Sequence, residues 1–356
     1  CTPSRAALLT GRLPIRNGLN VVLFPTSKDG IPDEELTLAE LLKTRGYTSA
    51  IVGKWHLGHR PQHLPLRHGF DRYFGIPYSN DMSPTTSVHP NKAAFPKTPL
   101  IQGEKTIEEE PDQSQLTQRY TKEAVSFIRD SAKAKKPFFL YLAHTMPHWP
   151  LAASERFRGK SGRGIYGDAV EEVDWSVGEV IRTLKELKLE RNTLVVFSSD
   201  NGPARYLKEE GGSAGGLRDG KGSTWEGGQR EPAIAWWPGK VKPAVSHAFG
   251  VTMDLFPTFA KLAGAELPKD RVYDGVDLGP VLFEGGAGRE PLLFHYNQGA
   301  LRAVRKGKWK LHMETNTAMP ERKNYTVRHP PLLFNLEVDY AEEFDVAAQH
   351  PEVVKE

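Results

Sequence analysis

The chain has 356 residues, of which 38% are hydrophobic and 26% are charged, the composition of an ordinary globular protein. Its 47 basic and 44 acidic residues are interspersed and give a net charge of only +3, which excludes a nucleic-acid surface built on a basic patch. No apolar run approaches the roughly 18 residues of a membrane helix, and a single cysteine excludes an internal disulfide.

Amphipathic helical patterns alternate with short apolar strands along most of the chain. The patterns predict, in chain order, a short helix at 6–9, a helix at 33–45, a strand at 47–52, a long loop at 77–112, a helix at 113–135, a strand at 138–143, a helix at 167–189, strands at 193–198 and 232–237, and a helix at 254–263. Such alternation is typical of a parallel sheet covered on both faces. The expected fold class is α/β, with a mostly parallel sheet flanked by helices.

The pattern changes near residue 290. Apolar segments at 301–304 and 309–312 flank a glycine-containing turn and predict a β-hairpin, and 332–336 predicts a further strand. These expectations divide the chain into an α/β domain at 1–289 and a small antiparallel β subdomain at 290–356, which ends in the start of a helix.

Chemically useful side chains follow three predicted strands, at the sheet edge where sites of parallel sheets form. They are Lys54 and His56 after the first strand, His144 and His148 after the second, and Asp200 and Asn201 after the third. The histidines raise the alternative of a zinc site, but neither a His-x-x-x-His pattern nor a cysteine cluster supports it. Without further context, Lys54 could equally be a solvated strand end and His56 a turn residue.

Two further segments have both a structural and a functional interpretation. Asp200-Asn201-Gly202 is a common turn sequence, yet its side-chain oxygens are hard donors that Ca²⁺ and Mg²⁺ accept, although two donors do not fill such a shell. The glycine-dense segment 215–228 approaches a phosphate-binding P-loop, but Gly222 stands where that loop requires Ser or Thr. Nucleotide binding is therefore not expected.

Cys1 precedes a helix-like run and lies near Arg5 in sequence, which is typical of a reactive cysteine. An inert core thiol or the lipid-modified start of a lipoprotein also fits a lone cysteine. The whole segment 1–12, however, resembles the signature C-x-P-S-R-x-x-x-x-T-G-R of the type I sulfatase family. The resemblance extends to 53–58, 75–81, 145–150, 220–228 and 333–336. It is closer to the arylsulfatase A branch at 75–81 and to the galactosamine-6-sulfatase branch at 14–18 and 58–61.

The resemblance implies an alkaline-phosphatase-like fold and a nucleophile made after synthesis. In that family a formylglycine-generating enzyme oxidises the cysteine, here Cys1, to formylglycine (3-oxoalanine), whose hydrate attacks sulfur. Arg5 and a Ca²⁺ ion, with Mg²⁺ as the alternative, would activate it. Asp200 and Asn201 would supply half of the cation ligands, and two aspartates from a strand upstream of Cys1, absent from this chain, would supply the rest.

The resemblance also implies roles for the remaining site residues. Lys54, Lys221 and Ser79 would contact the sulfate, His148 would contact it and protonate the leaving oxygen, and His56 would take the proton of the second hydroxyl of the hydrate. His144 is the less certain of the two histidines after the second strand. The sequence does not identify which sulfated compound is the substrate.

The expected activity is therefore hydrolysis of sulfate monoesters of sugars or aryl alcohols. The alternatives are a formylglycine-dependent phosphodiesterase or phosphonate monoester hydrolase, and a non-catalytic sulfoglycan-binding homologue. By family habit the protein is expected in the periplasm, outside the cell or in lysosomes, with any signal segment upstream of this chain. Because the upstream strand carries half of the cation ligands, residues 1–356 alone are expected to be inactive.

Overall fold

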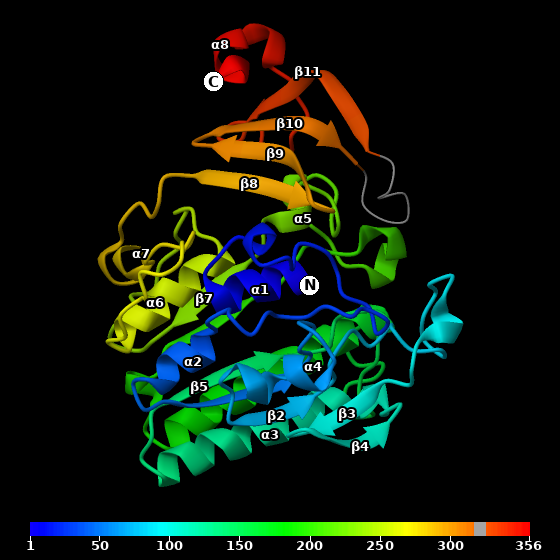
Figure 1. The fold of residues 1–356 in the computed structure, drawn as a ribbon, viewed down its shortest axis with the longest axis vertical. Coiled ribbons are helices and arrows are strands. Elements are labelled where there is room, and N and C mark those ends of the chain that lie inside the picture. The colour runs from blue at the N-terminus through cyan, green and yellow to red at the C-terminus, as the bar shows by residue number, and fades with distance from the viewer. Residues whose placement is uncertain (317–324) are drawn as a thin grey trace.

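The computed structural model describes residues 1–316 and 325–356, and it places the C-terminal sheet at one end of a larger α/β part (Figure 1). The helices are α1 (Thr2–Thr10), α2 (Leu38–Lys43), α3 (Gln113–Lys133), α4 (Gly164–Glu186), α5 (Glu226–Gln229), α6 (Leu255–Leu262), α7 (Gly279–Glu284) and α8 (Pro351–Lys355). The strands are β1 (Thr48–Gly53), β2 (Arg72–Gly75), β3 (Pro99–Gln102), β4 (Lys105–Glu109), β5 (Phe138–Ala143), β6 (Val195–Ser198), β7 (Ala233–Trp236), β8 (Leu292–Asn297), β9 (Ala300–Lys306), β10 (Trp309–Thr315) and β11 (Thr326–Asn335).

The largest sheet has five strands in the order β4-β3-β2-β1-β5, and β1 lies parallel to both β2 and β5. Successive side chains of a strand point to opposite faces. Ile51 accordingly joins the core that includes residues of α1, α2 and α6, whereas the next residue, Val52, packs in the core that includes Leu116 and Tyr120 of α3. The predicted α/β class, with helices on both faces of a sheet, is confirmed.

The loop predicted at 77–112 is wrong in its second half, which forms the β3–β4 hairpin. β3 pairs antiparallel with β2, so the sheet is mixed rather than parallel throughout. Leu100 and Ile101 are buried, and they are a two-residue apolar stretch in polar surroundings. So short a stretch has no detectable period, because a strand pattern needs several alternating residues to be recognised.

The strands at 195–198 and 233–236 also depart from the prediction. β6 and β7 pair antiparallel with each other and form a separate two-stranded sheet. Phe197 and Ile234, which face one another across that pair, are 40% and 62% exposed. An apolar run identifies a strand but does not determine its direction or its neighbour.

Helix boundaries follow local capping chemistry. The helix predicted at 33–45 begins only at Leu38, because Thr37 and Glu40 form a capping box that satisfies two backbone N–H groups at its start. The helix predicted from 167 begins three residues earlier, at Gly164. Such shifts leave the packed faces of the helices unchanged.

The C-terminal region forms an antiparallel sheet in the order β11-β10-β9-β8, as the predicted hairpin requires. β8 is an additional strand that the sequence pattern did not predict, and α8 is the expected terminal helix start. In Figure 1, α5 lies directly beneath β8, so the C-terminal sheet covers the segment that leads into α5. This contact connects the two parts of the molecule.

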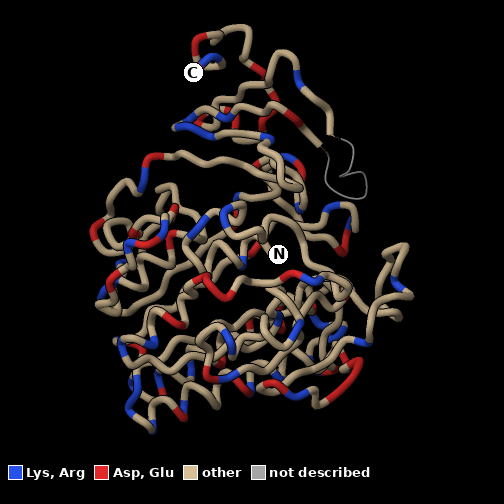
Figure 2. The backbone as a smooth tube through the Cα atoms, viewed as in Figure 1, with Lys and Arg blue, Asp and Glu red and all other residues tan. Residues whose placement is uncertain are grey.

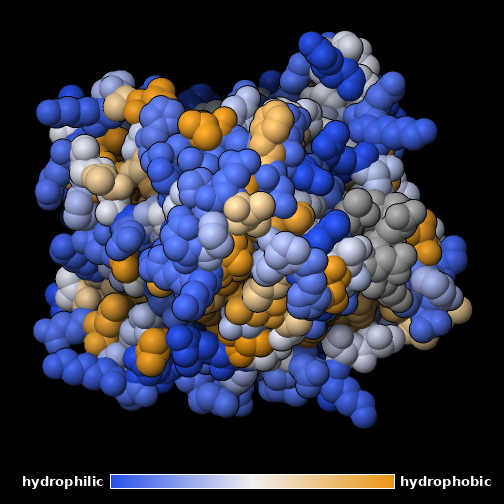
Figure 3. Space-filling view, turned by 90° about the horizontal axis from the view of Figure 1, so that it is seen from above, coloured by the Kyte–Doolittle hydropathy of each residue, from blue (hydrophilic) through white to orange (hydrophobic). Residues whose placement is uncertain are grey.

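Charged residues of both signs are distributed over the described part of the chain (Figure 2). The face seen in Figure 3 is mostly hydrophilic, with apolar side chains interspersed. Among the described residues, none of the helices combines the length and apolar character needed to cross a bilayer.

Candidate active site

Cys1 is the N-cap residue of α1, and it meets side chains from two distant segments. Its Sγ atom accepts a hydrogen bond from Lys54 Nζ at 3.3 Å and lies 3.7 Å from Asn201 Oδ1. The three residues are separated by 53 and 200 positions along the chain. The structure therefore brings together the three predicted site segments that begin at Cys1, follow β1 and follow β6.

Arg5 lies one helical turn after Cys1 and is almost fully buried. Its Nε and Nη2 atoms both lie 3.1 Å from Asp200 Oδ2, and its Nη1 donates to the backbone carbonyl of Lys54. Burial alone would raise the pKa of the Asp200 carboxyl, but the charges of Arg5 and of nearby lysines hold that pKa well below its usual range. Asp200 is therefore a carboxylate that fixes the Arg5 side chain.

The backbone after β1 explains why Lys54 and His56 reach the site. The N–H groups of residues 54, 55 and 56 donate to the carbonyls of Ala143, Ile76 and Pro77, so the chain stays clamped between its two neighbouring segments. Gly53 has φ 114°, and a Cβ there would overlap the carbonyl of Ala143. Only glycine permits this close approach at a positive φ.

The Lys54 side chain is buried between Cys1 and Ser79. Its Nζ donates to the Ser79 hydroxyl at 3.0 Å in addition to Cys1 Sγ. Burial, followed by the charge of Arg5, lowers the pKa of Lys54 to about 7. An ammonium that has lost most of its hydration can bind an anion strongly, because an incoming anion replaces the missing solvation.

A hydrogen bond to the backbone determines the tautomer of His56. Its Nε2 lies 2.9 Å from the carbonyl oxygen of Leu23, which can only accept, so Nε2 carries the proton. Its Nδ1 is buried without a hydrogen-bond partner among the described residues. Burial and the charge of Lys54 lower the pKa of His56 well below its usual value. The Nδ1 lone pair is therefore free to act as a base.

His148 and Lys221 form a second pair in the cluster. Lys221 Nζ lies 2.7 Å from His148 Nε2, and His148 Nδ1 lies 2.6 Å from the carbonyl of Trp149. The carbonyl fixes the proton on Nδ1, so Nε2 accepts from the Lys221 ammonium. Burial, followed by the charges of Lys221 and Lys54, lowers the pKa of His148 well below its usual value.

Asn80 is a site residue that the sequence reasoning missed. It is 1% exposed, and its Nδ2 donates to the carbonyls of His148 and Pro150 at 3.4 and 3.3 Å. It therefore connects the loop after β2 to the loop that carries His148. The residue lay inside the motif segment 75–81, but a loop asparagine by itself gives no sign of a contact 68 residues away.

His144 takes a different direction from His148. Its Nε2 lies 3.0 Å from the Ser176 hydroxyl of α4, and its ring lies 6.3 Å from that of Tyr120 of α3. Burial lowers the pKa of His144 to about 4. Its contacts are those of a neutral histidine packed between helices, so His148 is the better candidate for contact with a substrate.

The donor set of Asp200 and Asn201 fits part of a calcium shell. The two residues offer adjacent carboxylate and amide oxygens of the kind that Ca²⁺ prefers. Among residues 1–316 and 325–356, no group of three His, Cys, Asp or Glu side chains is placed to hold a metal ion. The chain thus provides two neighbouring oxygen donors next to Cys1, fewer than the six to eight that such a cation takes.

Two histidines, two lysines and an arginine–aspartate pair thus lie around a cysteine at a helix start, next to the carboxyl end of β1. The sulfatase family profile matches residues 1–265, and the profile of the C-terminal region of aryl-sulfatase matches residues 288–356. The chain belongs to the sulfatase family.

The similar proteins include enzymes from both expected branches. N-acetylgalactosamine-6-sulfatase of Mus musculus is 47% identical over 89% of this chain and 63% of that protein, and arylsulfatase A of Homo sapiens is 41% identical over 100% of this chain and 76% of that protein. Among solved structures, the PsFucS1 sulfatase from Pseudoalteromonas sp. has a TM-score of 0.89 and 31% identity, covering 99% of this chain and 77% of that one. The chain spans about 63% of the length of the N-acetylgalactosamine-6-sulfatases that it matches.

Proposed function

We propose that the protein hydrolyses sulfate monoesters, with formylglycine at Cys1 as the nucleophile-forming residue. The observation that carries the proposal is the placement of Cys1 Sγ 3.3 Å from Lys54 Nζ and 3.7 Å from Asn201 Oδ1. A nucleophile at this point lies between a cation that can bind a sulfuryl oxygen and an oxygen donor that can bind a metal ion.

The cationic groups have complementary roles in this reaction. Lys54 and Lys221 bind the sulfuryl oxygens, where negative charge must be neutralised for a nucleophile to approach sulfur. Arg5 stays charged at every relevant pH and, paired with Asp200, orients the start of α1. Ser79 holds the Lys54 ammonium toward Cys1.

His148 and His56 transfer protons in two different steps, cleavage of the substrate ester and release of sulfate. His148 Nε2 accepts a hydrogen bond from the Lys221 ammonium, so a proton passed from Lys221 to Nε2 would be the one delivered to the leaving alcohol. His56 has a free Nδ1 that can accept the proton of the second hydroxyl of the hydrate. Loss of that proton expels sulfate by C–O cleavage and regenerates the aldehyde, so no water attacks sulfur.

Asp200 and Asn201 would hold a Ca²⁺ ion, with Mg²⁺ as the alternative, together with ligands from outside the described residues. When bound, such an ion supplies charge that lowers the pKa of a coordinated hydroxyl and polarises a sulfuryl oxygen.

We further propose a sulfated carbohydrate as the substrate class. The relative that is 47% identical over 89% of this chain is named for the 6-sulfate of N-acetylgalactosamine. A formylglycine-generating enzyme would modify Cys1, and a compartment outside the cytoplasm follows from family habit. Cell fractionation and the mass of the Cys1 peptide test these two points.

The decisive experiment uses the protein expressed from its complete gene. Turnover is measured with an aryl sulfate, with N-acetylgalactosamine 6-sulfate and with an aryl phosphodiester, and a Cys1→Ala variant is the matched control. We expect sulfate ester hydrolysis that Cys1→Ala abolishes, and a Cys1 peptide lighter by about 18 Da, the difference between the sulfur and two hydrogens lost and the oxygen gained.

Two results would contradict the proposal. Unmodified Cys1 in fully active protein would exclude formylglycine chemistry. Faster turnover of the phosphodiester than of both sulfates would favour the phosphodiesterase alternative.

A further inference from the structure

Lys221 stands in a segment without regular structure, between Gly220 and the start of α5. Its backbone N–H donates to the carbonyl of Pro203 at 2.9 Å, and Gly202 donates to the carbonyl of Gly228 at 3.0 Å, so this segment lies against the loop after Asn201. A flexible four-carbon side chain needs a fixed backbone to bring its ammonium to one place. The remaining contacts of the segment therefore decide where Lys221 points.

Two asparagines of the C-terminal sheet hold the residue that follows Lys221. Asn297, the last residue of β8, donates through Nδ2 to the carbonyl of Gly222 at 2.9 Å. Asn316, directly after β10, donates to the same carbonyl at 3.1 Å. One backbone oxygen thus receives two side-chain donors from residues 75 and 94 positions away.

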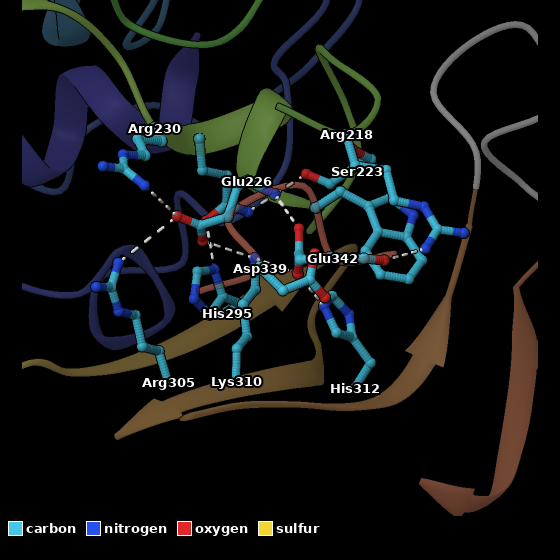
Figure 4. A network of polar contacts seen from close by, with 12 residues as sticks. Arg218, Ser223, Glu226, Arg230, His295, Arg305, Lys310, His312, Asp339 and Glu342 are labelled. Carbon is cyan, nitrogen blue, oxygen red and sulfur yellow. Dashed lines mark hydrogen bonds and ion pairs between the residues drawn. The ribbon is translucent and has the colours of Figure 1, made fainter. Parts of the chain in front are cut away.

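A buried network of charged side chains holds Glu226, at the C-terminal end of the segment that begins with Lys221 (Figure 4). Lys310 of β10 lies 2.9 Å from Glu226 Oε1 and 3.1 Å from Glu342 Oε1, while Glu342 Oε2 accepts from the backbone N–H of Glu226 at 2.6 Å. His312 Nε2 lies 2.7 Å from Glu342 Oε1. The side chains of Lys310, His312 and Glu342 are fully buried, so every charge depends on its partners for stabilisation.

Trp225 contacts both Asn316 and the buried charge network. Its indole Nε1 donates to the backbone carbonyl of Asn316 at 3.1 Å, and its ring packs 4.2 Å from the ring of His312. Arg218 covers the ring with its guanidinium 3.8 Å from the centroid. The segment from Gly222 to Glu226 is therefore in continuous contact with the C-terminal sheet.

We infer that Asn297 and Asn316 are positioning residues for Lys221, through which the C-terminal sheet helps to build the active site instead of merely covering it. The inference rests on the proposed role of Lys221 as a sulfate-binding cation. Loss of both donors frees the Gly222 carbonyl and lets the adjacent peptide of Lys221 rotate, which moves its ammonium away from His148.

The asparagines are better targets for the test than the charged network. Replacing Lys310 would leave Glu226 and Glu342 as buried, uncompensated carboxylates, and such a variant could fail to fold. The Asn297→Ala/Asn316→Ala variant removes two neutral donors. Asp345→Ala is the matched control, because Asp345 accepts from the backbone N–H groups of Leu333 and Ala347, which lie in the same region but outside residues 220–228.

A double-mutant cycle with Lys221→Ala measures whether the asparagines act through Lys221. We expect the asparagine variant to lose about tenfold in kcat/KM for an aryl sulfate, and to lose less than about twofold when Lys221 is already alanine. Equal losses in both backgrounds would overturn the inference, since a purely structural effect does not depend on Lys221.

Amide hydrogen exchange gives a second readout that does not depend on turnover. We expect faster exchange at residues 220–226 in the asparagine variant and not in Asp345→Ala. Unchanged exchange at residues 220–226 would overturn the inference, even if the protein expressed from its complete gene proved inactive on sulfates. Inactivity of the unsubstituted protein with faster exchange in the variant would instead contradict the proposed function and leave the positioning contact supported.

Discussion

Lys221 Nζ lies 2.7 Å from His148 Nε2, although 73 residues separate the two in the chain. An ammonium at this distance donates a hydrogen bond to the histidine, and its charge disfavours a second positive charge on the ring. The pair thus keeps His148 neutral until an anion arrives between the two side chains.

Replacing Lys221 by Met should raise the pKa of His148. Burial remains the larger cause of its low pKa, so the new pKa should still lie below the usual value. An NMR titration of the His148 ring measures the change, and kcat/KM should fall on the order of 10²-fold, as for loss of one preorganised donor. Lys221→Arg keeps the charge and should keep the pKa of His148 low. A His148 pKa unchanged by Lys221→Met would contradict the coupling.

Lys54 should set an alkaline limit on substrate capture. Its pKa of about 7, caused by burial and then by Arg5, means that the ammonium loses its proton as pH rises through 7 in the free protein. Sulfate binding needs the charged form, so kcat/KM should fall about tenfold per pH unit above that point. A bound sulfate ester raises the pKa of Lys54, and the corresponding limb in kcat should lie at higher pH. Lys54→Arg should remove the limb, and a persisting limb in that variant would assign it to another group.

Replacing Cys1 by Ser should trap a covalent intermediate. Serine attacks sulfur through its single hydroxyl but has no second hydroxyl from which His56 could take a proton. The variant should gain the mass of one SO₃ group and stop after a single turnover, which intact-protein mass spectrometry detects. Cys1→Ala should gain no mass under the same conditions. Steady multiple turnover by Cys1→Ser would refute release of sulfate by way of the aldehyde.

Removing the Asn80 side chain should slow the reaction by misplacing His148. Asn80→Ala leaves the carbonyls of His148 and Pro150 without their donor, and we expect about a tenfold lower kcat with a stability loss of about 1–2 kcal/mol. Thr86→Val is the matched control, because it removes a donor to the backbone carbonyl of Asn80 and leaves the Asn80 side chain in place. Equal kinetics in both variants would argue against a positioning role of the Asn80 side chain.

The strand ends that carry Lys54, His148 and Asp200 could be located from the sequence. Each follows a short apolar run. The parallel neighbours β1 and β5 end at the same edge of one sheet, which accounts for Lys54 and His148. Asp200 follows β6, which lies in a separate antiparallel sheet, so its place beside them depends on the tertiary structure. Residue types and the motif around Cys1 then indicated the chemistry. The structure places Cys1 beside Lys54 and Asn201, within the contact distances that a shared site requires.

The sequence by itself determined the fold class, most of the helices and strands, and the residues with which an anion site could be built, because periodicity and capping are local properties of the chain. Only the tertiary structure decided that β6 pairs antiparallel with β7, that Asn80 reaches the His148 loop, and that Asn297 and Asn316 hold the carbonyl next to Lys221. These contacts join residues tens of positions apart through single polar atoms, and no local pattern records which distant donor a carbonyl will meet once the chain has closed.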